Sequence, residues 1–128
     1  MEDLVSAPTI VNAGTSWPGI FSYEDRRSVD YLATRPEIDP NRIGCGGLSG
    51  GGLRTIFLAG LDGRIRCAFC VGFMSTMRGL LRNRIKSHRL FMYVPHLSRS
   101  LDLPDVIALR APAPLMVQYD RDDELFTL

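Results

Sequence analysis

One serine lies in a glycine-rich stretch that suits nucleophilic chemistry. The segment Gly47-Leu48-Ser49-Gly50-Gly51 reads G-x-S-x-G, between a short apolar run and an amphipathic helical pattern. A serine at such a junction lies on a sharp strand-to-helix turn that exposes its hydroxyl. The amide of Gly50 then lies at a helix N-terminus, where it can stabilise an oxyanion. We therefore expect Ser49 to be a nucleophile and Gly50 to form part of an oxyanion hole.

An acidic loop near the end of the sequence could supply the carboxylate that orients a catalytic base. The apolar run Leu115–Tyr119, an expected buried strand, is followed by four acidic residues: Asp120, Asp122, Asp123 and Glu124. Sites in open α/β sheets lie at the carboxyl ends of the strands. The order serine, then acid, is the one that goes with a G-x-S-x-G turn.

The histidine of a triad is harder to place. His88 and His96 are the two histidines, and both precede the acidic loop. Each is more simply explained as a surface or helix-end residue, so we give the general-base role to neither. We expect that a usual triad does not close within these 128 residues.

Other interpretations of the glycine cluster fit less well. A phosphate-binding P-loop needs a lysine before a serine or threonine, and none is present here. The dinucleotide fingerprint G-x-G-x-x-G would begin at Gly44 and Gly46, but Ser49 stands at its third glycine. The glycines could also simply allow tight packing without catalysis. No cofactor or metal is implied.

The cysteines do not indicate a redox or metal site. Cys67 and Cys70 have C-x-x-C spacing within an expected strand over residues 66–72. An odd offset on a strand places the two thiols on opposite faces, so we expect buried small hydrophobic residues. With Cys45 the chain has three cysteines, which predict no disulfide framework and favour a cytoplasmic location.

Composition indicates one globular domain. The net charge of +1 gives no reason to expect nucleic acid as a partner, and no secretory signal or membrane-length apolar run is visible.

We expect an irregular segment over residues 1–19, then an α/β domain over 20–128. Its expected elements are a helix from Ser22 to Pro36, a strand over 42–46, a helix after Ser49, the strand over 66–72, helices over 75–86 and from Asp102, and the strand over 115–119. Strand, helix and strand within some 30 residues predict a parallel sheet of about three strands flanked by helices.

Four motifs in order resemble the α/β-hydrolase superfamily, in particular its acetyl xylan esterase and dienelactone hydrolase-like branch. They are Tyr31–Gly44 running into Gly47–Gly51, Leu61–Ile65, Ala111–Met116 and Asp123–Phe126. The resemblance implies that Ser49 is the nucleophile, Gly50 an oxyanion-hole amide and Asp123 the triad acid, with Asp122 as runner-up. It also implies an ester substrate, with acetylated carbohydrate as the family's suggestion.

The same family carries an oxyanion loop before these motifs and a histidine after them. We therefore expect this sequence to be the central part of a hydrolase. Two functions follow as hypotheses. The first is a serine hydrolase of carboxylic esters that forms an acyl-enzyme. The second is a non-catalytic hydrolase domain that acts as a binding or oligomerisation module, with a homo-oligomer as one form.

Overall fold

The computed structural model describes residues 8–83 and 90–126, and these form a parallel sheet with helices packed on it. The strands are β1 (Gly44–Leu48), β2 (Cys67–Val71) and β3 (Leu115–Gln118), hydrogen-bonded in the order β1-β2-β3. Both neighbouring pairs are parallel. The predicted parallel sheet of three strands is confirmed.

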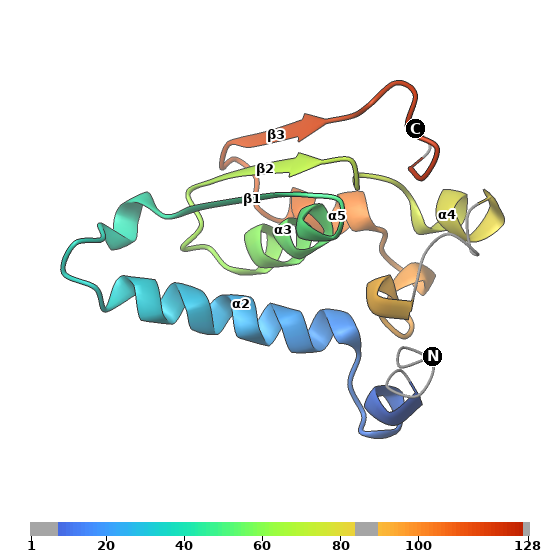
Figure 1. Ribbon diagram of the computed structural model, residues 1–128, viewed down its shortest axis with the longest axis horizontal. Helices are drawn as coiled ribbons and strands as arrows, with labels where there is room; N and C mark the ends of the chain where they lie inside the picture. The colour runs from blue at the N-terminus through green and yellow to red at the C-terminus, as the bar shows by residue number, and fades with distance from the viewer. Residues whose placement is uncertain (1–7, 84–89, 127–128) are drawn as a thin grey trace.

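Four labelled α-helices accompany this sheet in the described part of the chain, and three single-turn 3-10 helices lie in the connections (Figure 1). The α-helices named in the figure are α2 (Trp17–Ala33), α3 (Gly50–Leu61), α4 (Met77–Asn83) and α5 (Leu103–Ala108). The 3-10 helices are η1 (Pro40–Arg42), η2 (Leu90–Met92) and η3 (Leu97–Arg99). A further short helical turn covers residues 8–12. No helix in the described ranges is long and apolar enough to cross a bilayer.

The core lies between the sheet and α3. Leu53 and Ile56 of α3 are fully buried, as is Cys70 of β2. Because α3 also contacts α2 and α5, it is the central element of the described layers (Figure 1). Gly60 allows the close approach of α5, since a Cβ there would lie 2.3 Å from the carbonyl oxygen of Val106. Burial of these apolar side chains is the main force that holds the sheet and helices together.

The start of α2 corrects one expectation. The helix begins at Trp17 and not near Ser22, because Ser16 is its N-cap and accepts a hydrogen bond of 3.2 Å from the amide of Gly19. Pro18 fits the first turn, where its missing N–H is not needed. Residue 20, where we expect the domain to begin, therefore lies inside a helix, and the domain boundary itself stays a prediction.

The predicted start of α5 is confirmed, and its cap has a second role. Asp102 and Asp105 form a reciprocal capping box. The Oδ1 atom of Asp102 also accepts a hydrogen bond of 2.7 Å from the amide of Met77, the first residue of α4. One carboxylate thus ties the N-termini of two helices together, where the helix dipoles favour negative charge.

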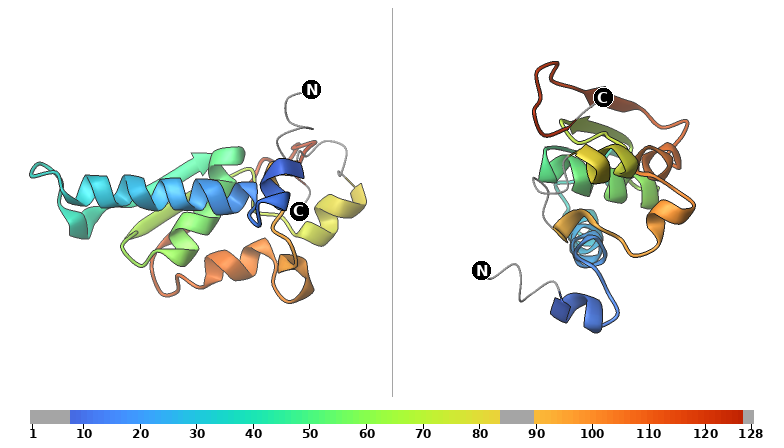
Figure 2. Two further views of the ribbon diagram at one scale, coloured as in Figure 1. Left: turned by 90° about the horizontal axis from the view of Figure 1, so that it is seen from below. Right: turned by 90° about the vertical axis from the view of Figure 1, so that its right-hand side faces the viewer.

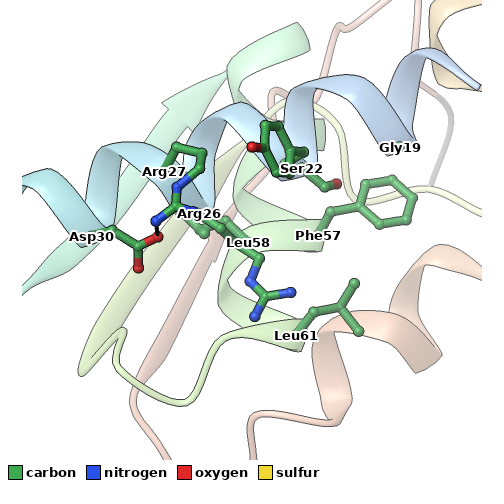
Figure 3. A pocket seen from close by; sticks show the side chains of 9 residues that line it. Gly19, Ser22, Arg26, Arg27, Asp30, Phe57, Leu58 and Leu61 are labelled. Carbon is green, nitrogen blue, oxygen red and sulfur yellow. Dashed lines mark ion pairs between the residues drawn. The ribbon is translucent and has the colours of Figure 1, made fainter.

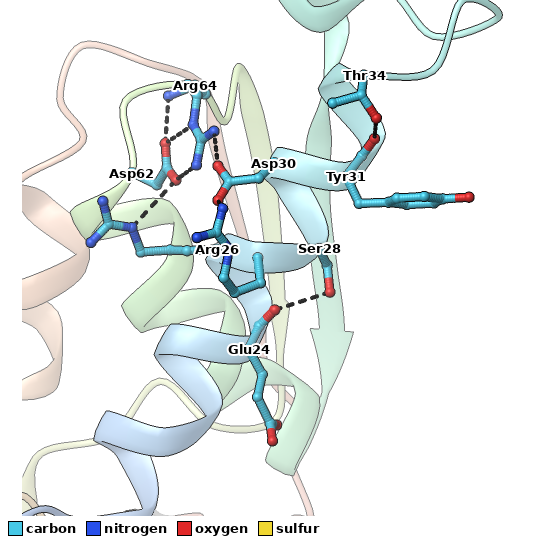
Figure 4. A network of polar contacts seen from close by, with 9 residues as sticks. Glu24, Arg26, Ser28, Asp30, Tyr31, Thr34, Asp62 and Arg64 are labelled. Carbon is cyan, nitrogen blue, oxygen red and sulfur yellow. Dashed lines mark hydrogen bonds and ion pairs between the residues drawn. The ribbon is translucent and has the colours of Figure 1, made fainter.

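Ion pairs join α2 to the turn before β2, at the amino end of the sheet (Figure 4). The Arg64 guanidinium binds Asp62 through Nε at 2.9 Å and Nη2 at 2.6 Å, and binds Asp30 through Nη1 at 2.5 Å. These hydrogen bonds from Arg64 lower the pKa of Asp62 and of Asp30. The side chain of Asp62 is only 5% exposed, so this expected turn residue is a fixed structural anchor.

Arg110 is a second anchor at the same end of the sheet. Its side chain is buried, and Nη2 donates a hydrogen bond of 2.9 Å to the carbonyl of Pro114, just before β3. Nη1 reaches the carbonyl of Ala59 in α3 at 3.3 Å. A buried guanidinium satisfied by carbonyls therefore connects α3 to the start of β3.

One face of the sheet is packed against α3, whereas the other carries none of the described helices (Figure 2). Leu48, Phe69 and Met116 point to this open face and are 69%, 46% and 55% exposed. Phe69 lies opposite both Gly46 and Met116, and its ring covers Gly46. Parallel sheets are normally covered on both faces, so this apolar face is an unusual feature of the chain.

The two thiols of the C-x-x-C motif lie on opposite faces, as expected. Cys70 is buried, but Cys67 is exposed on the open face, so the prediction that both are buried is wrong for Cys67. The reason is that the strand alternates and only the face towards α3 is covered.

Candidate active site

Ser49 occupies the sharp turn between β1 and α3. Its backbone has φ 55° and ψ −119°, a conformation that non-glycine residues rarely adopt. The turn is held by its neighbours, because the Ser49 amide donates to the Val71 carbonyl at 2.9 Å and the Ser49 carbonyl accepts from the Leu53 amide at 3.1 Å. The residue is exposed, and its hydroxyl makes no capping hydrogen bond to α3. Such strain at an exposed polar side chain motivates a functional hypothesis.

Gly47 is the glycine that this turn requires. A Cβ at Gly47 would lie 2.4 Å from the carbonyl carbon of Gly51, so the two backbones can approach only without a side chain there. Gly51 has open space around its own Cβ position. The G-x-S-x-G pattern therefore reflects one close backbone contact, which is the physical basis of the predicted turn.

The amide of Gly50 begins α3, a helix of 12 residues. The first amides of a helix have no partner within the helix and carry its positive dipole end. The ring of Phe91 in η2 approaches Gly50, with Cε2 3.9 Å from the Cβ position of Gly50. The arrangement combines an exposed hydroxyl that makes no cap to α3, a helix N-terminus and a nearby aromatic ring.

Asp123 lies at the same carboxyl end of the sheet. Its Oδ2 atom is 3.7 Å from the Cβ position of Gly72, the residue after β2, and the Leu48 Cδ1 atom is equally close to that position. Its Oδ1 atom accepts the amides of Leu125 at 2.8 Å and Phe126 at 3.1 Å. One oxygen is thus fixed by the loop backbone, while the other faces the ends of β1 and β2.

Phe126 explains why the acidic loop returns to the sheet. Its ring is buried against Phe73, with the ring centroids 4.6 Å apart. The runner-up acid, Asp122, is exposed, and its amide donates to Asp120 within the loop. Burial and orientation therefore favour Asp123 over Asp122.

Two contributors to the site were not predicted. Gly72 has φ +67°, and this left-handed conformation brings the chain after β2 past Asp123. A glycine directly after a buried strand was the signal for it in the sequence. Phe91 had no such signal, because its contact with Gly50 depends on the tertiary arrangement of η2.

The histidines do not complete a triad in the described part of the chain. His96 is exposed and precedes η3 in a left-handed conformation, with its carbonyl accepting the Arg99 amide at 3.1 Å. This fits the expected surface or helix-end residue. His88 lies outside the described residues.

The thiols and carboxylates form no cluster that suggests metal or redox chemistry within the described ranges. Burial raises the pKa of Cys45 to about 11 and also raises the pKa of Cys70. Both thiols therefore stay protonated near neutral pH and are poor nucleophiles and ligands.

A cavity of about 370 Å³ lies between α2 and α3, away from the serine turn (Figure 3). Arg26 and Asp30 of α2 face Phe57 and Leu61 of α3 across it. None of the predicted site residues lines this cavity, so it gives no support to their roles.

The comparisons with known proteins bear on the fold. No family model matches the chain. A Bacillus subtilis protein named "Putative hydrolase YtaP" is 32% identical over 99 residues, which are 75% of this chain and 32% of that protein.

Solved esterase structures share the fold. A putative acetyl xylan esterase from Bacteroides fragilis has a TM-score of 0.72 at 22% identity, covering 88% of this chain and 32% of that one. A glucuronoyl esterase from Solibacter usitatus has a TM-score of 0.63 at 20% identity, covering 83% and 31%. The fold is therefore that of part of an α/β-hydrolase, as the resemblance predicts. The chain spans about a third of the length of these proteins.

Proposed function

We propose that this chain carries the nucleophile and acid of a serine hydrolase that acts on carboxylic esters. Ser49 attacks the acyl carbonyl and forms an acyl-enzyme, and the Gly50 amide stabilises the oxyanion. Asp123 orients the general base. The observation that carries the proposal is the strained, exposed serine at the start of α3. The hydrolase and esterase names of the similar proteins support the same reaction class.

The general base is a separate part of this proposal. We assign it to neither His88 nor His96, so a full triad takes its imidazole from elsewhere in a longer protein or from a neighbouring chain. Loss of one triad member lowers the rate by orders of magnitude but leaves the rate that binding and oxyanion stabilisation supply. Acetylated carbohydrate is the substrate suggested by the similar acetyl xylan esterase, and it is part of the proposal.

Hydrolysis of para-nitrophenyl acetate tests the assignment. Ser49→Ala is expected to reduce the rate to the uncatalysed level. In the longer protein or the assembly that supplies the imidazole, Asp123→Asn is expected to lower the rate about tenfold or more, because Asp123 acts through that base. Asp122→Asn is the matched control, because it changes the neighbouring carboxylate in the same loop, and it is expected to leave the rate within about twofold. Equal losses for both aspartates would remove the role of Asp123. An unchanged rate in Ser49→Ala would contradict the hydrolase proposal.

The open sheet face favours one alternative, a non-catalytic module that associates through this face. Leu48, Phe69 and Met116 give it a contiguous apolar surface, and such surfaces mark interaction sites. Light scattering separates the alternatives. The module is supported if Met116→Lys abolishes the association. The control Leu109→Lys, at a similarly exposed position, should leave the association intact. A monomer with ester turnover contradicts the module.

A further inference from the structure

A second cavity, of about 340 Å³, lies at the start of α2. Its walls come from the helical turn over residues 8–12, the first residues of α2 and the segment after η2. The lining side chains that matter here are Ile10, Val11, Trp17, Tyr93, Val94 and Pro95.

The described walls of this cavity carry no charge and offer almost no free hydrogen-bonding group. The Ser16 hydroxyl, which also lines it, is engaged as the cap of α2. The Tyr93 hydroxyl is buried and has no hydrogen-bond partner among the described residues, and burial raises the pKa of Tyr93. A charged or many-hydroxyl ligand would lose its hydration here without replacement. The cavity therefore suits an uncharged aliphatic or aromatic group.

The cavity is connected to the serine turn by one short segment. The Phe91 ring lies 3.9 Å from the Cβ position of Gly50, and Tyr93, which lines the cavity, follows Phe91 by two residues. The 3-10 helix η2 contains Phe91 and contacts α2. Figure 1 shows η2 and the start of α2 at the end of the molecule where β1 passes into α3.

We propose that this cavity binds the uncharged apolar group of an ester whose carbonyl lies at Ser49, with Phe91 as the wall between them. The inference rests on the proposed hydrolase function and adds its substrate preference. Recognition is by apolar contact, so the ring of Tyr93 and not its hydroxyl contributes to binding. An apolar acyl or alkoxy group then binds this cavity better than a sugar, so the inference keeps the ester hydrolysis but departs from acetylated carbohydrate as its substrate.

Fluorescence of Trp17, the single tryptophan of the sequence, reports directly on the cavity and needs no catalysis. We expect 6-bromo-1-hexanol to quench it saturably, because bromine quenches indole at contact. The anionic 6-bromohexanoate is expected to bind about tenfold more weakly. Xylobiose at the same concentrations should not displace the bromohexanol. Equal, non-saturating quenching by both bromo compounds would overturn the proposal, as would displacement by xylobiose.

Matched variants locate the binding. Val11, on the cavity wall, is 59% exposed, and Leu109, on α5's C-terminal side, is 63% exposed. Val11→Asp should weaken bromohexanol binding about tenfold by placing a charge at the apolar wall, whereas Leu109→Asp should not. Tyr93→Phe should retain binding. Equal binding in Val11→Asp and the wild type would overturn the assignment of the cavity.

The connection to Ser49 has its own readout. Saturating 1-hexanol is expected to slow the labelling of Ser49 by a long-chain alkyl fluorophosphonate. As a control, the Ser49→Ala variant is expected to bind bromohexanol as the wild type does. Labelling that hexanol does not slow would separate the cavity from the serine and overturn the substrate role. Failure of Ser49 to label at all, with saturable quenching intact, would instead refute the hydrolase proposal and leave the cavity as a ligand site.

Discussion

The two ends of the sheet are built in opposite ways. At the amino end, Arg64 is paired with two carboxylates and Arg110 is bonded to backbone carbonyls. At the carboxyl end, Ser49 and Gly72 have left-handed backbones, and Asp123 turns one oxygen away from its loop. The first arrangement stabilises the fold, whereas the second stores strain at one exposed polar residue, Ser49. This contrast is typical of α/β sheets, whose sites lie at the carboxyl ends of the strands.

The largest effect is expected at the backbone contact that shapes the serine turn. Gly47→Ala places a Cβ against the backbone of Gly51, which cannot move aside as a side chain can, and should lower the free energy of unfolding by about 3 kcal/mol. Urea denaturation measures it. Gly51→Ala is the control, because its Cβ meets open space within a helix, and it should be neutral or stabilising. Similar losses in both variants would show that the contact is not what constrains the turn.

Arg110→Met tests the amino end. The substitution keeps much of the apolar stem but leaves the carbonyls of Ala59 and Pro114 without their donor, so we expect a loss of about 2 kcal/mol. Arg78→Met, at an exposed position on α4, should change stability by less than about 0.5 kcal/mol. If the two variants unfold at the same urea concentration, Arg110 is not an anchor.

Asp62→Asn should cost about 1 kcal/mol near neutral pH, a modest value because Arg64 is 40% exposed to solvent. The pKa of Asp62 is lowered below 3.8 in the folded state, so the unfolded chain binds its proton first. The contribution is therefore present above this value and is lost as the pH falls through the lower folded pKa. The stability difference between wild type and variant should shrink below about pH 4. A difference that stays constant down to pH 2 would exclude the ion pair as its cause.

The smallest effect is expected at the serine itself, and its sign is reversed. Ser49→Gly removes the Cβ that is strained at φ 55°, which stabilises the folded state. The greater entropy of the unfolded glycine chain offsets part of this effect, so the free energy of unfolding should rise by up to about 1 kcal/mol. Ser49→Ala keeps the strain and should unfold like the wild type. Thermal unfolding of the three proteins distinguishes these outcomes. A destabilised Ser49→Gly would show that the turn is not strained.

The fold could be predicted from the sequence because turn and cap signals mark the ends of most elements, and because the helices α3 and α5 bury the apolar faces that their periodicity predicts. The capped helix after Asp102 has both. The strand before Ser49 and the apolar run 115–119 form strands as predicted, but no residue of β1 or β3 is buried. The expectation that 115–119 is a buried strand is therefore wrong, because β3 is the edge of the described sheet and one face of that sheet is open. The start of α2 was missed because Ser16 and Ser22 are both plausible caps, and packing decides between them. The exposed Cys67 was missed because periodicity does not reveal whether both faces of a sheet are covered.

The site could be predicted only where a motif fixes the backbone. Ser49 and Gly50 follow from the turn that Gly47 permits, and the positions of both agree with the expected geometry. The contributions of Gly72 and Phe91 depend on how distant segments meet, which no local pattern encodes. The catalytic roles of Ser49, Gly50 and Asp123 stay predictions.

The central claim is that the hydroxyl of Ser49 is a presented nucleophile. The most direct test is to treat the protein with a fluorophosphonate, digest it and locate the modified residue by mass spectrometry, with Ser49→Ala alongside. We predict a single adduct on Ser49 and none in the variant. An adduct on another residue, or equal modification of wild type and variant, would contradict the account.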